Sequence, residues 1–248
     1  MTESEWLAGN DPQPMLLFLR GKVSSRKLRL FACTCCRSIW HLLTNNAGRD
    51  AINVAEHHAD GLASDRERTS VLRRVSKAWT SHNEALPEAY QKSDAEGDAG
   101  GVLVTAIDGA RACVAKDAFE AAYEGTICAA HAVGRNAATV GTSAKAELVG
   151  REKQYAHQTR LLRDVIGNPF RPTKINPAWL TPTVTNLAQA AYDERILPSG
   201  ELDRERLAIL SDALEEAGCD DGDILNHLRS PGPHVRGCWA VDLLLGRS

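Results

Sequence analysis

Apolar residues recur at three- and four-residue steps along most of this chain, and no stretch alternates long enough to form a half-buried strand. Residues 24–43 show the pattern best, with an apolar stripe at Leu28, Phe31, Ala32, Cys35, Ile39 and Leu42. Alanine is frequent and aromatic residues make up only 5% of the chain, which favours helices packed closely through small side chains. The sequence therefore predicts an all-α fold, a bundle-like array of many helices.

Capping residues and helix breakers set the expected boundaries. We expect helices over 12–19, 24–43, 46–62, 64–86 and 144–166, the last capped by Ser143, and an exposed loop over 93–101. The Ala-rich stretch 102–140 is expected to form one long helix or two. Gly109, Gly125 and Gly134 mark breaks in it, or places where helices approach closely.

Four prolines between residues 167 and 182 exclude a continuous helix there. We therefore expect an N-terminal helical body over 1–166, a Pro-rich connector over 167–182, and a compact C-terminal segment over 183–248 packed on the body. Four short helices are expected in that segment, at 183–195, 203–217, 221–229 and 234–245.

Composition narrows the class of protein. Hydrophobic residues at 43% and charged residues at 25% argue against global disorder, and a net charge of −3 argues against nucleic-acid binding through overall charge. The first residues are polar, and no apolar run approaches the ~20 residues of a membrane span. Seven cysteines are an odd number, and three of them crowd into residues 33–36, where disulfides between neighbours are geometrically poor. These features predict a reduced, cytoplasmic protein without a membrane segment.

The last thirty residues contain the clearest candidate site. Cys219, His227, His234 and Cys238 are soft or borderline metal ligands, and zinc needs four such ligands at one tetrahedral point. His234 and Cys238 have the spacing of one helix face, with His227 at the end of the preceding helix and Cys219 near its start. The same residues also fit ordinary core packing, because free cysteine is among the most buried residue types. Zinc is therefore the one cofactor that the sequence suggests.

A basic run near the N-terminus is a candidate anion-binding or nucleic-acid-binding site. No acidic residue occurs between positions 20 and 37, and the cations of the run are Arg20, Lys22, Arg26, Lys27, Arg29 and Arg37. Such a run can contact phosphates. A solvated helix face, or pairing with the acidic C-terminal third of the chain, explains the run better.

Other clusters allow both a chemical and a structural interpretation. Cys33 and Cys36, followed by His41, could form a metal or redox site, but their apolar neighbours favour packing. His57 and His58 lie between Glu56 and Asp60 without a recognisable metal motif. Asp164 and Asp242 lie among apolar residues and are expected to be buried acids held by arginine; the candidates are Arg163, Arg171, Arg229 and Arg236.

Several motifs resemble those of a family of uncharacterised all-helical bacterial proteins. They are LLRDVIGNPFRP at 161–172 and HVRGCWAVDLLLG at 234–246, with further similarity over 5–43, 51–62 and 207–233. The resemblance implies a bacterial protein with an all-helical fold, and it implies no known activity.

With no catalytic residues identified, we expect a non-enzymatic helical interaction or adaptor protein that binds a protein partner or itself. The alternatives are a zinc-stabilised or metal-dependent protein and, further, a nucleic-acid-binding protein.

Overall fold

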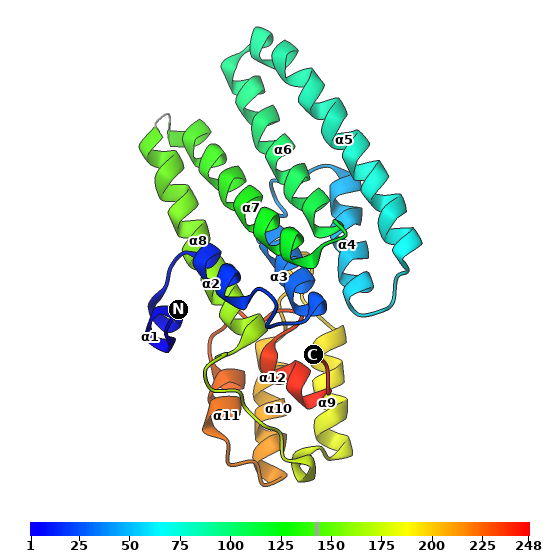
Figure 1. Ribbon diagram of the computed structural model, residues 1–248, viewed down its shortest axis with the longest axis vertical. Coiled ribbons are helices and arrows are strands. Elements are labelled where there is room, and N and C mark those ends of the chain that lie inside the picture. Colours follow the sequence, from blue (N-terminus) through cyan, green and yellow to red (C-terminus); the bar gives the residue numbers. More distant parts are fainter. Residues whose placement is uncertain (142–143) are drawn as a thin grey trace. The chain divides into compact units, whose positions relative to one another are not determined.

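The computed structural model describes residues 1–141 and 144–248, and the chain divides into two compact units, Met1–Thr159 and Arg160–Ser248. The first unit contains α1 (Glu3–Ala8), α2 (Pro12–Leu19), α3 (Ser25–Arg37), α4 (Asn46–Ala59), α5 (Asp65–Lys92), α6 (Asp94–Cys113), α7 (Ala118–Gly141) and most of α8 (Ala144–Ile166). The second unit contains the end of α8, a short 3-10 helix η1 (Pro177–Trp179), α9 (Pro182–Asp193), α10 (Arg204–Glu216), α11 (Gly222–Arg229) and α12 (Trp239–Leu244) (Figure 1). The all-α prediction is confirmed.

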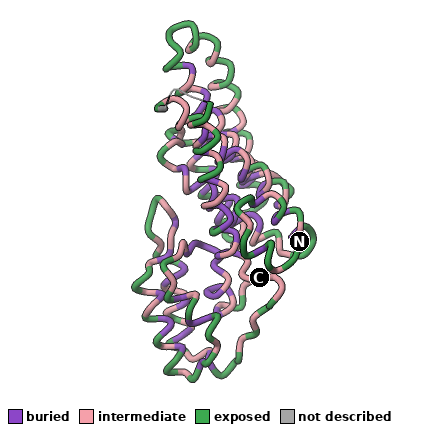
Figure 2. The backbone as a smooth tube through the Cα atoms, turned by 90° about the vertical axis from the view of Figure 1, so that its left-hand side faces the viewer, coloured by how far each residue is buried: buried purple, intermediate pink, exposed green. Residues whose placement is uncertain are grey.

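Helix α3 forms the centre of the first unit. Every residue from Leu28 to Arg37 is buried, because α4, α6 and α7 all pack around the helix. In Figure 2 buried residues run along the inner sides of the neighbouring helices, while the far tips of the longest helices are exposed. The core of this unit thus lies where α3 meets its neighbours.

Helices α5 and α6 form a long antiparallel hairpin, and here the expected loop over 93–101 is wrong. Ser93 ends α5 and also begins α6, since its Oγ accepts a hydrogen bond from the backbone N–H of Glu96 (3.1 Å). The Tyr90 ring lies where a Cβ on Gly97 would be, so that glycine permits close approach inside a helix. The Ser93-x-x-Glu96 pattern is a helix start signal that the glycines obscured.

Helix α5 also continues past Pro87, where we expected it to fray. Proline removes one intrahelical hydrogen bond, which frees the carbonyl of Asn83. Both residues are exposed, so water can satisfy that carbonyl.

The expected cap of α8, Ser143, lies outside the described residues.

The Ala-rich stretch 102–140 is divided between α6 and α7 by a short turn. The break falls at 114–117 and not at a glycine, and Asp117 accepts the backbone N–H of Glu120 at the start of α7 (2.8 Å). Gly109 marks a close approach: a Cβ there would lie 3.2 Å from Cys128 Cβ and 3.3 Å from Cys36 Sγ. Three helices therefore meet at Gly109.

The Gly109→Ala variant should lower the free energy of unfolding by about 1–2 kcal/mol, because overpacking outweighs the gain in helix propensity. Gly125→Ala is the matched control, since its nearest neighbour to an added Cβ is 3.5 Å away. Urea denaturation of both variants measures the difference. If Gly109→Ala were as stable as Gly125→Ala, the tight packing of α3, α6 and α7 would be wrong.

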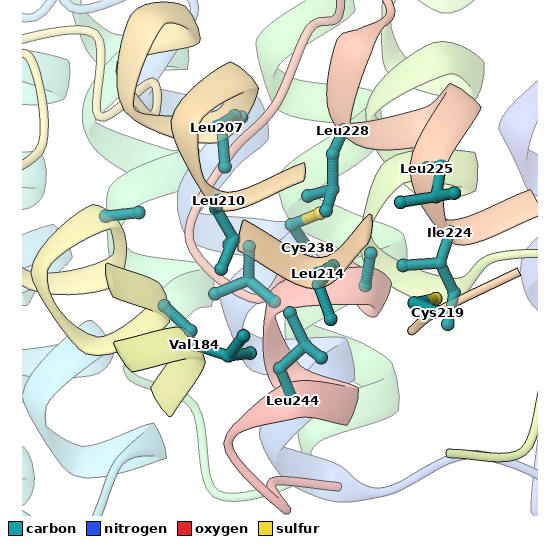
Figure 3. Packing of buried hydrophobic residues seen from close by; sticks show 14 of the residues in the cluster. Val184, Leu207, Leu210, Leu214, Cys219, Ile224, Leu225, Leu228, Cys238 and Leu244 are labelled. Carbon is teal, nitrogen blue, oxygen red and sulfur yellow. The ribbon is translucent and has the colours of Figure 1, made fainter. Parts of the chain in front are cut away.

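The second unit has its own apolar core, formed by α9, α10, α11 and α12 (Figure 3). Three of its four helices begin and end within two residues of the expected positions. The fourth does not: α12 begins at Trp239, and residues 230–238 form an irregular segment. The boundary between the units also falls inside α8, and not after it.

No helix in the described part of the chain is long and apolar enough to cross a membrane.

Candidate metal centre

Four potential metal ligands converge within the second unit. They are Asp164, His227, His234 and Cys238, and their ligand atoms all lie within 4.8 Å of one another. Asp164 comes from the last turn of α8 and His227 from the last turn of α11. His234 and Cys238 come from the irregular segment that leads into α12. The site therefore joins the beginning of the unit to its end.

Glycines give the segment 230–238 its irregular path. Gly232 and Gly237 have φ values of +81° and +90°, which side-chain-bearing residues rarely adopt. Backbone bonding then fixes the segment to residues 201–202: Val235 bridges Glu201, and the carbonyl of His234 accepts the N–H of Leu202 (2.8 Å). The expectation that His234 and Cys238 share one helix face is therefore wrong, although both side chains reach the same point.

The contacts within the group are short. Asp164 Oδ1 lies 3.0 Å from His234 Nδ1 and 3.1 Å from His227 Nε2. The same His227 Nε2 lies 3.1 Å from Cys238 Sγ. The second carboxylate oxygen, Asp164 Oδ2, accepts the backbone N–H of Val235 (2.8 Å). One oxygen of Asp164 thus anchors the backbone and the other faces the ligand group.

The group is shielded from solvent. The side chains of Asp164 and His234 are 2% and 1% exposed, that of His227 is 19% exposed, and Cys238 is fully buried. Burial raises the pKa of Asp164, but hydrogen bonds from the two histidines outweigh it and hold that pKa below its ordinary value. Burial lowers the pKa of His234, but the Asp164 carboxylate outweighs it and leaves that pKa raised. The site therefore favours an ionised Asp164 carboxylate next to a protonated His234.

Contacts outside the group orient both imidazoles. His234 Nε2 lies 3.1 Å from the carbonyl oxygen of Ser230, so Nε2 carries a proton and donates it there. That leaves Nδ1 as the atom facing Asp164. The His227 ring packs against Trp239 with ring centroids 4.9 Å apart, and it meets the His234 ring nearly edge-on, at 83°. A hydrogen bond from the second ring nitrogen to a carbonyl, as His234 makes to Ser230, is typical of histidines that bind metals.

Two hydrolytic triads can be drawn in this group, and the geometry disfavours both. Ser230 Oγ lies 3.2 Å from His234 Nε2, and Asp164 lies on the other ring nitrogen, as in a Ser–His–Asp triad. However, the Ser230 carbonyl already accepts the proton on Nε2, so this nitrogen cannot act as the base. A Cys238–His227–Asp164 triad fails because cysteine and carboxylate approach the same nitrogen.

Of the four ligands expected from the sequence, the structure brings three together, and Asp164 stands where we expected Cys219. Cys219 is 5% exposed and belongs to the apolar core, on the Ile224 side of the cluster in Figure 3. Burial raises the pKa of its thiol. Asp164 is buried as expected, but its partners in the site are two histidines and a backbone amide, where we expected arginine.

The basic run 20–37 does not form one exposed face. Arg29 is buried and donates to the backbone carbonyls of Cys113, Ala115 and Lys116. Arg37 is buried against Glu56, and Arg26 pairs with Asp60 at 2.8 Å. Arg20 lies over the Phe119 ring and Lys22 over the Phe18 ring. Lys27 lies in the first turn of α3 and is half-buried. Most side chains of the run therefore make contacts within the protein.

Truncating Arg37 should be costly. Its guanidinium donates to both carboxylate oxygens of Glu56, at 2.6 and 2.8 Å, and both side chains are 3% exposed. The Arg37→Ala variant leaves an unpaired buried charge and should lower the free energy of unfolding by about 3–5 kcal/mol. Arg74→Ala, at a site 60% exposed, is the control and should cost less than about 1 kcal/mol. Equal urea midpoints for the two variants would contradict the buried pair.

Several of the remaining candidates are buried or paired with other residues. Cys33 and Cys36 are buried in α3, Cys36 Sγ lies 3.5 Å from Cys113 Sγ, and burial raises the pKa of the Cys33 thiol. His58 pairs with Asp65. Asp242 is buried in α12. In the part of the chain that the structure describes, only the Asp164 group brings three or more potential ligands together.

Comparisons with protein-family models, with curated proteins and with solved structures found no match to this chain. The resemblance to a bacterial family therefore stays a prediction.

Proposed function

We propose that the second unit is a zinc-stabilised helical module in which Asp164, His227, His234 and Cys238 hold one zinc ion. The observation that carries the proposal is the convergence of four ligand atoms within 4.8 Å at a buried point. Zinc accepts this mixture of carboxylate, imidazole and thiolate ligands, and soft thiolate disfavours magnesium and calcium.

The spacing of the ligand atoms supports a tetrahedral ion. Metal–ligand bonds of about 2.0–2.3 Å at tetrahedral angles separate the ligand atoms by about 3.3–3.7 Å. Three of the six pairs in the group measure 3.0, 3.1 and 3.1 Å and the other pairs lie within 4.8 Å, so these distances lie around the tetrahedral value and small shifts of the side chains would admit the ion. The ligand atoms would be Asp164 Oδ1, His227 Nε2, His234 Nδ1 and Cys238 Sγ.

A metal-free hydrogen-bond network explains the same contacts less well. His227 Nε2 faces both the Asp164 carboxylate and the Cys238 sulfur, and one N–H cannot point well at both. A cation at the centre satisfies all four atoms at once through their lone pairs. It would displace the proton that otherwise stabilises the contact between His234 and Asp164.

The role of the ion is structural. Four protein side chains would fill a tetrahedral shell, which leaves no open position for water or substrate. The ligands also join α8 to the segment after α11, so the ion would close the unit in the way that a cross-link does. This makes the metal-stabilised alternative the one that the geometry favours; the interaction or adaptor role stays a prediction of the sequence.

Metal analysis of protein purified without a histidine tag tests the proposal. We expect about one equivalent of zinc per chain in the wild type and less than about a tenth in Cys238→Ser, because a hydroxyl is a poor zinc ligand. Cys35→Ser, which removes a buried thiol far along the chain from the site, is the matched control and should keep its zinc. A wild-type protein with less than a tenth of an equivalent, even after refolding with zinc, would refute it.

A further inference from the structure

A second acid-free basic run lies in α5, and its cations face outward. From Arg68 to Asn83 the sequence contains neither aspartate nor glutamate. Four cations in or beside this stretch are exposed: Arg66, Arg73, Arg74 and Lys77. We call these four residues the α5 cationic stripe. It lies in the first unit and is independent of the proposed zinc site.

The stripe is straight because the helix is regular. Arg66, Arg73 and Lys77 occupy positions i, i+7 and i+11, which share one side of a helix, and Arg74 lies beside them. At about 1.5 Å per residue, the stripe extends for about 16 Å. Exposed hydroxyls of Ser70, Thr80 and Ser81 flank it. Arginine, lysine, serine and threonine are among the side chains that contact phosphates.

Three of these four cations have no ion-pair partner among the described residues. No acidic side chain of the described residues forms an ion pair with Arg66, Arg73 or Lys77, and Arg74 approaches Asp50 only to 4.0 Å, with both side chains more than half exposed. This distinguishes the stripe from the basic run 20–37, where Arg26 and Arg37 pair with acids and Arg29 is buried. The positive charge of α5 is therefore available to an external anion.

We propose that the α5 cationic stripe binds the phosphate backbone of a nucleic-acid duplex. A duplex carries about one negative charge per 1.7 Å of its axis, so about nine charges of the two strands lie within a length equal to that of the stripe. Helix α5 packs on α4 and α6 and lies at the outer edge of the first unit, where a rod-like ligand could reach it (Figure 1). Charge complementarity with a regularly spaced polyanion is the basis of the proposal.

Two features favour a duplex over other polyanions. An anionic membrane is usually bound by a helix that also inserts apolar side chains, but the apolar residues between the cations of the stripe are buried (Val71 and Val75) or half-buried (Leu72). Single-stranded nucleic acid is usually held by exposed aromatic rings. The one aromatic ring near the stripe, Trp79, is half-buried beneath Arg111.

Fluorescence anisotropy with a labelled DNA duplex of about 20 base pairs tests this surface through its salt dependence. Four phosphate contacts predict that affinity falls about 100-fold between about 50 and 200 mM salt. With two contacts removed, the Arg73→Ala/Lys77→Ala variant should bind more weakly at low salt and lose only about tenfold over the same range. The control, Lys145→Ala/Lys153→Ala, removes two exposed lysines from α8 and should match the wild type.

Three outcomes would overturn the proposal. The first is no binding of the duplex at low salt. The second is an equal salt dependence for the α5 variant and the α8 control. The third is binding to vesicles that contain phosphatidylserine with no binding to the duplex. Because Arg73 and Lys77 are exposed, circular dichroism should show both variants fully folded, so that a loss of affinity reports on the surface.

Discussion

Removing zinc should destabilise the second unit and leave the first largely intact. An ion present at about a thousand times its dissociation constant adds about 4 kcal/mol to the stability of the state that binds it. In a unit of this size each kcal/mol shifts the melting temperature by about 4–8 °C, so chelation should lower the melting temperature of the unit by about 15 °C or more. Adding zinc back should restore it.

Hydrogen exchange followed by mass spectrometry can locate this effect. We expect faster exchange after chelation in peptides covering 160–166 and 227–238, which contain the four ligands, and little change in α3 and α7 of the first unit. The Cys238→Ser variant is the control, since it should exchange fast with or without chelator. Chelation that left exchange in 227–238 unchanged would mean that no structural ion acts there.

Replacing Asp164 by asparagine should lower zinc affinity by more than about 100-fold, beyond the usual cost of losing an outer-sphere partner. Asparagine keeps an oxygen for the backbone N–H of Val235 but removes the anionic ligand. Cys219→Ala should keep full zinc affinity, because that thiol belongs to the apolar core. Its cost should be a modest loss of packing.

Competition with a chromogenic zinc chelator measures both affinities. Together the two variants distinguish the ligand set of the structure, which includes Asp164, from the set that the sequence suggests, which includes Cys219. If Cys219→Ala lost zinc and Asp164→Asn retained it, the sequence-derived set would be right and the geometry wrong.

The fold could be predicted from the sequence because helical periodicity and capping residues are local signals. The prediction was wrong where two local signals conflicted. At 93–101 the glycines suggested a loop, but Ser93 and Glu96 form a helix start. The packing glycine Gly109 could be recognised as a candidate, but only the arrangement of α3, α6 and α7 shows what approaches it.

The candidate site was predicted only in part, for a physical reason. His227, His234 and Cys238 lie close together in the chain, so their spacing drew attention to them. Asp164 is 70 residues from His234, and only tertiary structure can bring it there. Its apolar neighbours correctly predicted burial, whereas nothing local indicated histidine partners. The structural role of the basic run 20–37 could not be predicted for the same reason. Helix α3 is enclosed by other helices, and its Arg29 and Arg37 are buried.

The most direct test of the central claim is a crystal structure with diffraction data collected on both sides of the zinc absorption edge. We predict one anomalous peak per chain, about 2.0–2.3 Å from Asp164 Oδ1, His227 Nε2, His234 Nδ1 and Cys238 Sγ. A zinc-loaded crystal with no peak among these four atoms, or with a peak bound by Cys219 in place of Asp164, would contradict the account.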